Sequence, residues 1–357
     1  MAKMLMKGNE AIGEAAIRAG CRNYFCYPIT PQSEVAEYLS RRMPEVGGTF
    51  LQAESELAAS NMIFGAAATG EMAFTTSSSP GISLMSEAIS YIAGAQLPAV
   101  FVNIVRGGPG LGGILPAQSD YLQATKGGGH GDYRVLVLAP STVQEAVDHT
   151  MLAFRLAEEY RNPIMVLGDG MIGQMMEPVE LDELPPNQSL PSKETWATCG
   201  AKGRPRNIVR SLFLEPEVLE KNNHVLAAKY ARWHEKEIRF ATYNCDRDID
   251  LLVVAYGMTA RICMTAIDEL GAEGIRVGLL RPISLYPFPS KKVAELADRV
   301  GRVLCVEMSM GQMIEDVQAA VGRNMKVRFF GRTGGVVPSP DEVAAKIRQL
   351  VKLEACA

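Results

Sequence analysis

The sequence predicts an α/β protein with two parallel-sheet domains, the second smaller than the first. Short apolar runs typical of buried strands alternate with helical patterns over residues 1–180, and the same alternation returns after residue 248. Strands that alternate with helices form right-handed βαβ units and a mainly parallel sheet. A chain of 357 residues is also too long for one ordinary hydrophobic core.

The composition narrows the class of protein. An apolar fraction of 47% and a charged fraction of 21% are typical of a globular protein. The net charge of −4 gives no reason to expect a nucleic-acid partner, which requires a clustered basic face. No apolar run reaches the ~18 residues needed to cross a bilayer, and the first residues do not form a signal peptide, so we expect a cytoplasmic protein without a membrane partner.

The seven cysteines are scattered and form no CxxC pair, so their spacing predicts neither an iron–sulfur cluster nor a zinc ribbon. Cys21 and Cys26 are close enough in sequence to pair or to share a metal. The interpretation we favour is that they are reduced thiols packed inside a cytoplasmic protein.

Three segments follow from the alternation: a first domain at residues 1–180, a connector at 181–247 and a second domain at 248–357. The connector contains loop-like stretches and a long charged helix at 215–242, and we expect it to wrap a neighbour. The expected strands are at 23–27, 72–76, 99–105, 135–138, 163–167, 249–255, 277–280, 303–307 and 327–330. The expected helices are at 10–19, 32–43, 54–68, 83–94, 142–160, 259–270 and 340–352.

Two candidate substrate-binding residues follow strands of the first domain. Thr30 lies between two prolines in a strand-to-helix loop, and Arg106 comes directly after the strand at 99–105. Ligands bind at the carboxyl edge of a parallel sheet, and an arginine there can hold a carboxylate through two hydrogen bonds. The alternatives are a rigid turn in which Ser33 caps the next helix, and an ordinary surface arginine.

A candidate acid stands at the start of the alanine-rich helix. Glu54 and Glu56 both lie where negative charge suits the helix dipole, which is the default explanation. Glu56, however, is followed by Leu-Ala-Ala and should enter the core. A carboxyl group in apolar surroundings can act as an acid at neutral pH. Thiamine diphosphate chemistry needs one such carboxyl, to hydrogen-bond the ring nitrogen of the aminopyrimidine. Gly65 within this helix suggests close packing.

A hydroxyl-rich turn at residues 75–81 also follows a strand and precedes a helix. Ser79 and Gly81 can line a cofactor groove, or the hydroxyl groups can simply cap the helix.

Two further motifs are misleading. Residues 108–113 satisfy GxGxxG after a strand, but Pro109 and Pro116 disfavour a clean helix N-terminus and hence a dinucleotide site. Gly168-Asp169-Gly170 resembles the start of the magnesium–diphosphate motif of thiamine enzymes. The stretch expected to complete it, residues 195–199, has neither an asparagine nor a second acid for an oxygen shell. We therefore expect no metal site in this chain.

Taken together, these segments resemble the α-type subunits of 2-oxoacid:ferredoxin oxidoreductases. The similarity is carried by Gly-Asn-Glu-Ala at 8–11, Tyr-Pro-Ile-Thr-Pro at 27–31, Glu-Ser-Glu at 54–56, Ser-Pro-Gly at 79–81 and Arg-Gly-Gly-Pro at 106–109, in the order of the family. The segments at 126–132 and 168–178 are most similar to the type that acts on branched-chain 2-oxoacids such as 3-methyl-2-oxobutanoate (the VorB type). Cys26 departs from the family, in which many relatives have glycine there.

The resemblance implies that the first domain is a pyrimidine-type thiamine diphosphate-binding domain. Glu56 matches the activating glutamate, and Thr30 and Arg106 match substrate-contacting positions. Ser79 and Gly81 are the expected cofactor neighbours. The second domain is similar to the transketolase C-terminal domain, which is chiefly structural, through Leu-Arg-Pro at 280–282 and Glu-Met-Ser-Met-Gly-Gln at 307–312.

The resemblance also implies partners. A β subunit holds the diphosphate, Mg²⁺ and a [4Fe-4S] cluster, and γ and ferredoxin-like δ subunits or domains complete the complex. The expected reaction converts a 2-oxoacid and coenzyme A into acyl-CoA and CO2 while ferredoxin is reduced. Branched-chain acids are favoured over 2-oxoglutarate and pyruvate. The alternatives are a self-sufficient thiamine lyase or transketolase-like enzyme, and a non-catalytic scaffold that docks an electron-transfer partner.

Overall fold

A seven-stranded sheet forms the centre of the first domain in the computed structural model, which describes residues 3–181 and 190–355. Its order is β12-β6-β7-β5-β4-β2-β3, and every neighbouring pair is parallel except β12 with β6. The strands are β2 (Asn23–Cys26), β3 (Thr49–Gln52), β4 (Ala73–Ser77), β5 (Ala99–Val105), β6 (Leu136–Leu138), β7 (Pro163–Asp169) and β12 (Ser284–Tyr286).

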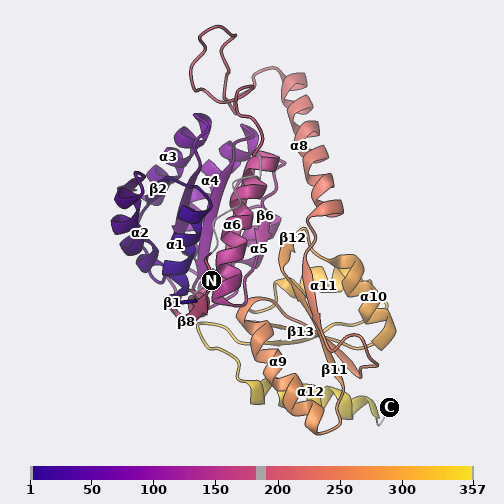
Figure 1. Cartoon of the computed structure of the whole chain (residues 1–357). Helices are drawn as coiled ribbons and strands as arrows, with labels where there is room; N and C mark the ends of the chain where they lie inside the picture. The colour runs from indigo at the N-terminus through magenta and orange to yellow at the C-terminus, as the bar shows by residue number, and fades with distance from the viewer. Residues whose placement is uncertain (1–2, 182–189, 356–357) are drawn as a thin grey trace.

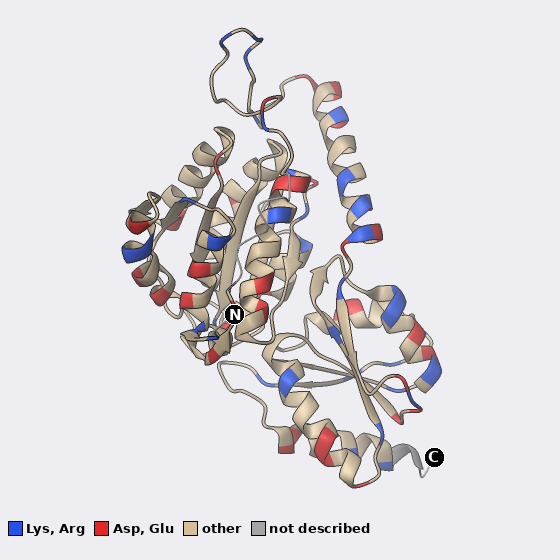
Figure 2. Ribbon diagram, in the orientation of Figure 1, with Lys and Arg blue, Asp and Glu red and all other residues tan. Residues whose placement is uncertain are grey.

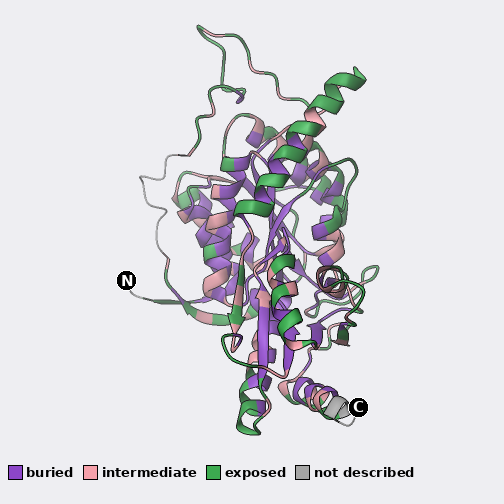
Figure 3. Cartoon of the chain, turned by 90° about the vertical axis from the view of Figure 1, so that its right-hand side faces the viewer, coloured by how far each residue is buried: buried purple, intermediate pink, exposed green. Residues whose placement is uncertain are grey.

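Helices cover both faces of this sheet because each presents one apolar side to it (Figures 1 and 3). On one face α1, α2 and α6 pack around Ile12, Leu39 and Phe154. On the other face α3 and α4 pack around Ile63 and Met85. The helices are α1 (Gly8–Arg18), α2 (Ser33–Glu45), α3 (Glu56–Ala68), α4 (Ser79–Gly94), α5 (Tyr121–Lys126), α6 (Val143–Tyr160) and α7 (Gly170–Gln174).

The second domain contains a five-stranded sheet in the order β14-β13-β10-β11-β9, parallel except for β9. Charged residues of this domain lie mainly on its helices and loops, whereas its central strands carry few (Figure 2). Its strands are β9 (Phe240–Tyr243), β10 (Leu251–Val254), β11 (Val277–Pro282), β13 (Val303–Glu307) and β14 (Arg328–Gly331). Its helices are α9 (Gly257–Ala272), α10 (Ser290–Val300), α11 (Met313–Val321) and α12 (Pro340–Ala355).

The predicted fold class is confirmed, and each strand and helix expected in the two domains is present. The strand predicted for residues 99–105 is β5 itself. Several elements were missed, including helices α10 and α11. Strand β3 has mostly exposed side chains and so carries no apolar run, and β1 (Met4–Lys7) pairs only with β8 (Met176–Val179) outside the main sheets. Residues 182–189 of the predicted connector lie outside the described residues.

The prediction of one helix over 215–242 was wrong at its C-terminal end. Helix α8 (Pro216–Lys236) stops earlier, and β9 follows because its backbone pairs with β11 of the second domain. The C-terminal half of α8 packs on the chain's own first domain, where Trp233 is fully buried beside Tyr160. The N-terminal half is exposed (Figure 3).

Two local expectations are also corrected. Gly65 does not serve close packing, since a Cβ at this position would meet nothing within 4 Å. Ser33 does not cap α2, because the N-cap residue is Gln32 and no side chain caps this end. Cys21 and Cys26 are unpaired, buried thiols, as we favoured.

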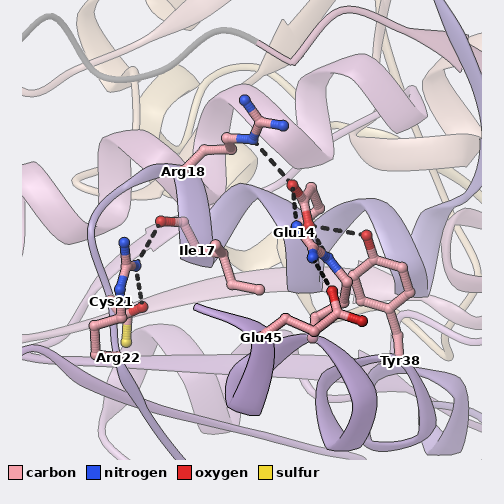
Figure 4. A network of polar contacts seen from close by, with 8 residues as sticks. Glu14, Ile17, Arg18, Cys21, Arg22, Tyr38 and Glu45 are labelled. Atoms are coloured by element: carbon pink, nitrogen blue, oxygen red, sulfur yellow. Dashed lines mark hydrogen bonds and ion pairs between the residues drawn. The ribbon is translucent and has the colours of Figure 1, made fainter. Parts of the chain in front are cut away.

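A buried carboxylate fixes α2 against α1 (Figure 4). Glu14 accepts hydrogen bonds from Arg18 Nε at 2.9 Å, Tyr38 OH at 2.8 Å and Arg42 Nε at 3.2 Å. Burial alone would raise the pKa of Glu14, but the hydrogen bonds from Arg42, Tyr38 and Arg18 outweigh it and lower that pKa. This cluster therefore fixes the helix that directly follows the loop containing Thr30.

An ion pair joins the two domains. Arg281 of β11 donates from Nη1 and Nη2 to the two carboxylate oxygens of Glu145 on α6, at 2.7 and 2.6 Å. Burial would raise the pKa of Glu145, but the hydrogen bonds and charge of Arg281 lower it to about 2. The core beside α4 also continues into the second domain through Leu252 and Cys305, so the two domains share packing as well as charge.

We expect Arg281→Gln to lower the free energy of unfolding by about 2 kcal/mol at neutral pH, because it leaves Glu145 partly buried without its cation. The folded-state pKa of Glu145 lies below the ordinary 4.5, so this stabilisation is present above pH 4.5 and lost as the pH falls toward 2. Urea unfolding at several pH values should therefore show the two proteins converging in acid.

The control is Arg348→Gln, which removes an exposed ion pair with Glu273 and should have a much smaller effect. An Arg281→Gln deficit that stays constant from neutral pH to pH 3 would contradict this account of the pair.

Candidate functional site

Three residues predicted for the site meet at the carboxyl ends of β2, β4 and β5. Arg106 Nη1 donates to the carbonyl oxygen of Thr30 at 2.9 Å, and Arg106 N donates to Ser79 Oγ at 3.1 Å. Arg106 is only 8% exposed, so the alternative of an ordinary surface arginine is wrong. Its Nη2 donates to Leu111 O at 3.1 Å, and its Nε is buried without a partner among the described residues.

The loop that carries Thr30 is held from below. The fully buried Asn9 donates from Nδ2 to the carbonyl oxygen of Pro31 at 2.8 Å, and Gln174 Nε2 donates to the same oxygen at 3.1 Å. This contact explains the Gly-Asn-Glu-Ala motif of α1. Thr76 on β4 donates to Gln32 from the other side. The backbone of Thr30 is therefore fixed, while the residue itself is exposed at the edge of the sheet.

Glu56 is buried, with 6% of its surface exposed, whereas Glu54 is exposed. Ser55, and not Glu56, caps α3, because its Oγ accepts from Ala58 N at 3.1 Å. The carboxyl group of Glu56 instead lies against α4. A Cβ added to Gly81 would stand 2.7 Å from Glu56 Oε1, so only glycine leaves room for this approach. Glu56 is still in the first turn of α3, where the helix dipole favours its negative charge.

Unsatisfied hydroxyl groups lie in β4 and in the turn before α4, and one of them, Ser77 Oγ, is next to Gly81. Thr75 Oγ1, Ser77 Oγ and Ser78 Oγ are buried and have no hydrogen-bond partner in the described residues. Ser78 is the N-cap residue of α4 but makes no side-chain cap, so the simple capping explanation fails for it. Buried hydroxyl groups normally have partners. A polar heterocycle such as the aminopyrimidine of thiamine diphosphate would give them partners beside Glu56, so these residues fit that cofactor.

Two further residues were missed from the sequence. Asn103 Nδ2 donates to Asp120 Oδ2 at 2.9 Å, and Asp120 also faces Ser79. Burial raises the pKa of Asp120, although the hydrogen bonds from Ser79 and Asn103 and the charge of Arg106 oppose this. Asp120 lies at the far end of the long loop that follows β5, and Asn103 lies within an apolar strand, so neither position carried a signal.

The two misleading motifs have structural explanations. Residues 108–113 form a loop with no helix directly after it. Asp169 caps α7, accepting from Met171 N at 2.9 Å and Ile172 N at 3.1 Å, and burial raises its pKa to about 6. Within residues 3–181 and 190–355, no three His, Cys, Asp or Glu side chains gather in a way that could hold a metal ion. No helix in the same residues is long and apolar enough to cross a bilayer.

The second domain contacts the loop between Arg106 and α5 at Gln118. This residue of the first domain is 2% exposed. Gln118 Nε2 donates to Tyr256 O at 2.9 Å, and its Oε1 accepts from Thr259 Oγ1 at 2.8 Å and Met308 N at 3.0 Å. Gln118 N donates to Met308 O at 2.8 Å. The Glu-Met-Ser-Met-Gly-Gln segment thus fixes the stretch between Arg106 and α5.

Two protein-family models match the chain. The thiamine diphosphate-binding model of pyruvate flavodoxin/ferredoxin oxidoreductases matches residues 14–217, and core domain II of pyruvate:ferredoxin oxidoreductases matches residues 249–343. This chain belongs to the 2-oxoacid:ferredoxin oxidoreductase family. The family resemblance predicted from the five motifs is therefore confirmed, as is the oxidoreductase class.

Relatives of known name cover nearly the whole length. A ketoisovalerate oxidoreductase subunit VorB from Methanothermobacter thermautotrophicus is 50% identical, with 98% of each chain covered. A 2-oxoglutarate synthase subunit KorA from the same organism is 35% identical, with 97% of this chain and 98% of that one covered.

Solved structures agree on the fold. The 2-oxoglutarate:ferredoxin oxidoreductase from Magnetococcus marinus, solved with 2-oxoglutarate, coenzyme A and succinyl-CoA bound, has a TM-score of 0.84 at 25% identity. The match covers 98% of the present chain and 66% of the longer Magnetococcus marinus chain. A split-gene transketolase, described as an inactive β4 tetramer, has a TM-score of 0.61 at 15% identity and shares the fold over 98% of this chain and 99% of that one.

We expect Gly81→Ala to reduce turnover of the assembled oxidoreductase about tenfold or more, equivalent to at least about 1.4 kcal/mol of barrier. The new Cβ would lie 2.0 Å from Ser77 Oγ and 2.7 Å from Glu56 Oε1, forcing the carboxyl group out of place. Steady-state kinetics with saturating thiamine diphosphate measures the effect.

Gly65→Ala is the matched control on the neighbouring helix, because its Cβ meets nothing within 4 Å. It should leave turnover unchanged and raise stability by about 0.5–1 kcal/mol. Equal activity of the two variants would show that the close approach of Glu56 to Gly81 is not needed for turnover.

Proposed function

We propose that this chain is the α-type subunit of an oxidoreductase that oxidatively decarboxylates a branched-chain 2-oxoacid. The products are acyl-CoA and CO2, and the electrons pass to ferredoxin. The observation that carries this proposal is the buried carboxyl group of Glu56, set against Gly81 and a group of unpartnered hydroxyls. The name of the 50% identical relative, a ketoisovalerate oxidoreductase subunit, supports the choice of substrate class.

Glu56 is proposed to exchange a proton with the ring nitrogen of the cofactor's aminopyrimidine. Its burial on an apolar helix strengthens such a hydrogen bond, because the local dielectric is lower than that of water. Thiamine diphosphate supplies, when bound, the electron sink that decarboxylation of a 2-oxoacid requires. Ser79 and Gly81, in the first turn of α4, are proposed to line the same groove.

Arg106 and Thr30 are proposed to orient the substrate. The Arg106 guanidinium is buried, keeps a fixed position through Thr30 O and Leu111 O, and retains one unpartnered Nε–H. A cation held in this way attracts the carboxylate of a 2-oxoacid, and a guanidinium can bind it through two hydrogen bonds. The hydroxyl of Thr30 is proposed to face the substrate at the exposed edge of the loop.

The remainder of the site is proposed to come from other polypeptides. A β subunit would hold the diphosphate, Mg²⁺ and a [4Fe-4S] cluster, and γ and ferredoxin-like δ subunits would complete a complex that uses coenzyme A and ferredoxin. Exposed apolar side chains on α3 and α4 support such a partner: Leu57, Leu84 and Tyr91 are 45%, 56% and 37% exposed. The buried free thiols are consistent with a cytoplasmic location.

We expect Glu56→Gln to abolish turnover in the assembled complex while assembly stays intact, since glutamine has the shape of glutamate but cannot give up a proton. Glu54→Gln, an exposed neighbour, is the control and should behave as wild type. Size-exclusion chromatography and dye-linked kinetics provide the two measurements. Near-normal activity of Glu56→Gln would end the proposal for this residue.

Cofactor binding by the isolated chain, together with the activity of the reconstituted complex, distinguishes this proposal from the two alternative functions. The lone subunit should bind thiamine diphosphate weakly in calorimetry, because the diphosphate grip is assigned to the β subunit. Tight stoichiometric binding would favour a self-sufficient thiamine enzyme. A reconstituted complex whose activity is indifferent to the cofactor would favour a scaffold that only docks an electron-transfer partner.

The substrate is tested by reconstituting the complex and measuring viologen reduction. We expect kcat/KM to be highest for 3-methyl-2-oxobutanoate, followed by 2-oxoglutarate and then pyruvate. The 35% identical 2-oxoglutarate synthase subunit makes 2-oxoglutarate the second candidate. A preference for 2-oxoglutarate would overturn the branched-chain assignment but not the family.

A further inference from the structure

Asp120 is a partly buried acid with no role in the proposed chemistry. It occupies the N-cap position of α5 but makes no side-chain cap there. Its carboxylate instead accepts a hydrogen bond from Asn103 Nδ2 of β5 at 2.9 Å and lies beside Ser79. An N-cap aspartate usually bonds to its own helix. Asp120 leaves that role unfilled and contacts residues of two neighbouring segments.

The contact with Ser79 reaches Arg106. Ser79 Oγ accepts from Arg106 N at 3.1 Å and lies 3.3 Å from Arg106 O. Asp120 is therefore bonded to β5 through Asn103, and it lies beside the serine that holds the backbone at the end of this strand, from which the buried guanidinium extends. A shift of this backbone would move the guanidinium relative to Thr30.

The second domain fixes Asp120 from both sides. Gln312 Nε2 donates to Ser119 O at 2.6 Å, and Gln312 Oε1 accepts from Leu122 N at 2.9 Å. Tyr121 OH donates to Asp316 at 2.6 Å. Residues on either side of Asp120 are thus hydrogen-bonded to the start of α11. The position of Asp120 therefore depends on the second domain, which resembles the chiefly structural C-terminal domain of transketolases.

We propose that Asp120 is a positioning residue for substrate binding, held in place by Gln312 of the second domain and acting on Arg106 through Asn103 and the end of β5. This inference rests on the proposed role of Arg106 in holding the substrate carboxylate. It adds a function for the second domain, which would set the affinity of the site for the 2-oxoacid and not only support the fold.

The test compares KM and kcat in the reconstituted complex with 3-methyl-2-oxobutanoate as the probe. Asp120→Ala removes both contacts and should raise KM about tenfold, equivalent to about 1.4 kcal/mol, with kcat changed less than about threefold. Asp120→Asn keeps one acceptor oxygen and should recover part of the loss. Such a split, with graded rescue, is not expected from a merely destabilised protein.

Gln312→Ala tests the role of the second domain without touching the site. It should raise KM in the same direction as Asp120→Ala. Gln318→Ala is its matched control. The side chain of Gln312 makes two hydrogen bonds to backbone groups, and that of Gln318, within α11, makes three, at Gly322, Met325 and Val327, but none near Asp120. Gln318→Ala should leave KM unchanged even if it lowers the thermal stability by a similar amount.

The variant Arg106→Lys distinguishes the proposed role of Arg106 from that of Asp120. If it leaves KM unchanged, the proposed role of Arg106 fails, and the inference about Asp120 fails with it. If Arg106→Lys raises KM but Asp120→Ala and Gln312→Ala do not, only the positioning role is overturned. Equal KM values for Gln312→Ala and Gln318→Ala would likewise overturn the contribution of the second domain.

Discussion

The buried guanidinium of Arg106 is the point from which the rest of the site is organised. A cation removed from water needs several acceptors, and here they are backbone carbonyl groups of two different loops, at Thr30 and Leu111. Satisfying this one group brings the loop after β2 and the glycine-rich loop after β5 together. The loop after β2 is also held in place by Asn9 of α1, which bonds to Pro31, and by Thr76 of β4, which bonds to Gln32.

The two domains form one structural unit around that point. The core beside α3 and α4 runs into the second domain, β12 extends the first sheet, and Arg281 binds Glu145 across the junction. Gln118 adds a buried polar contact, in which both its side-chain and backbone groups are satisfied by the second domain. Buried polar groups of this kind specify one arrangement, because any other would leave them without partners. The geometry of the site therefore depends on both domains.

The cofactor side of the site is incomplete in a chemically informative way. Glu56 and Gly81 are packed closely enough to exclude a methyl group, yet three neighbouring hydroxyls have no partner among the described residues. Helix α3 is apolar on most of its surface, and Leu57 nevertheless remains exposed. These features support the proposal that this chain supplies one part of a shared cofactor site, with an exposed apolar side chain beside it. They agree with a family whose members are subunits of larger oxidoreductases.

The sequence by itself determined the alternation of strands and helices and the family. It also allowed the proposed site residues Thr30, Glu56, Ser79, Gly81 and Arg106 to be named, because strand ends and helix starts carry local signals of composition. Strand β9, strand β12 and Asp120 could not be found, because each is defined by a partner far away in the sequence. Only the tertiary structure decided that Arg106 is buried, that Glu56 and not Glu54 turns inward, and that the second domain fixes Asp120. The physical reason is that burial and hydrogen bonding depend on which segments meet, whereas apolar periodicity depends only on neighbours along the chain.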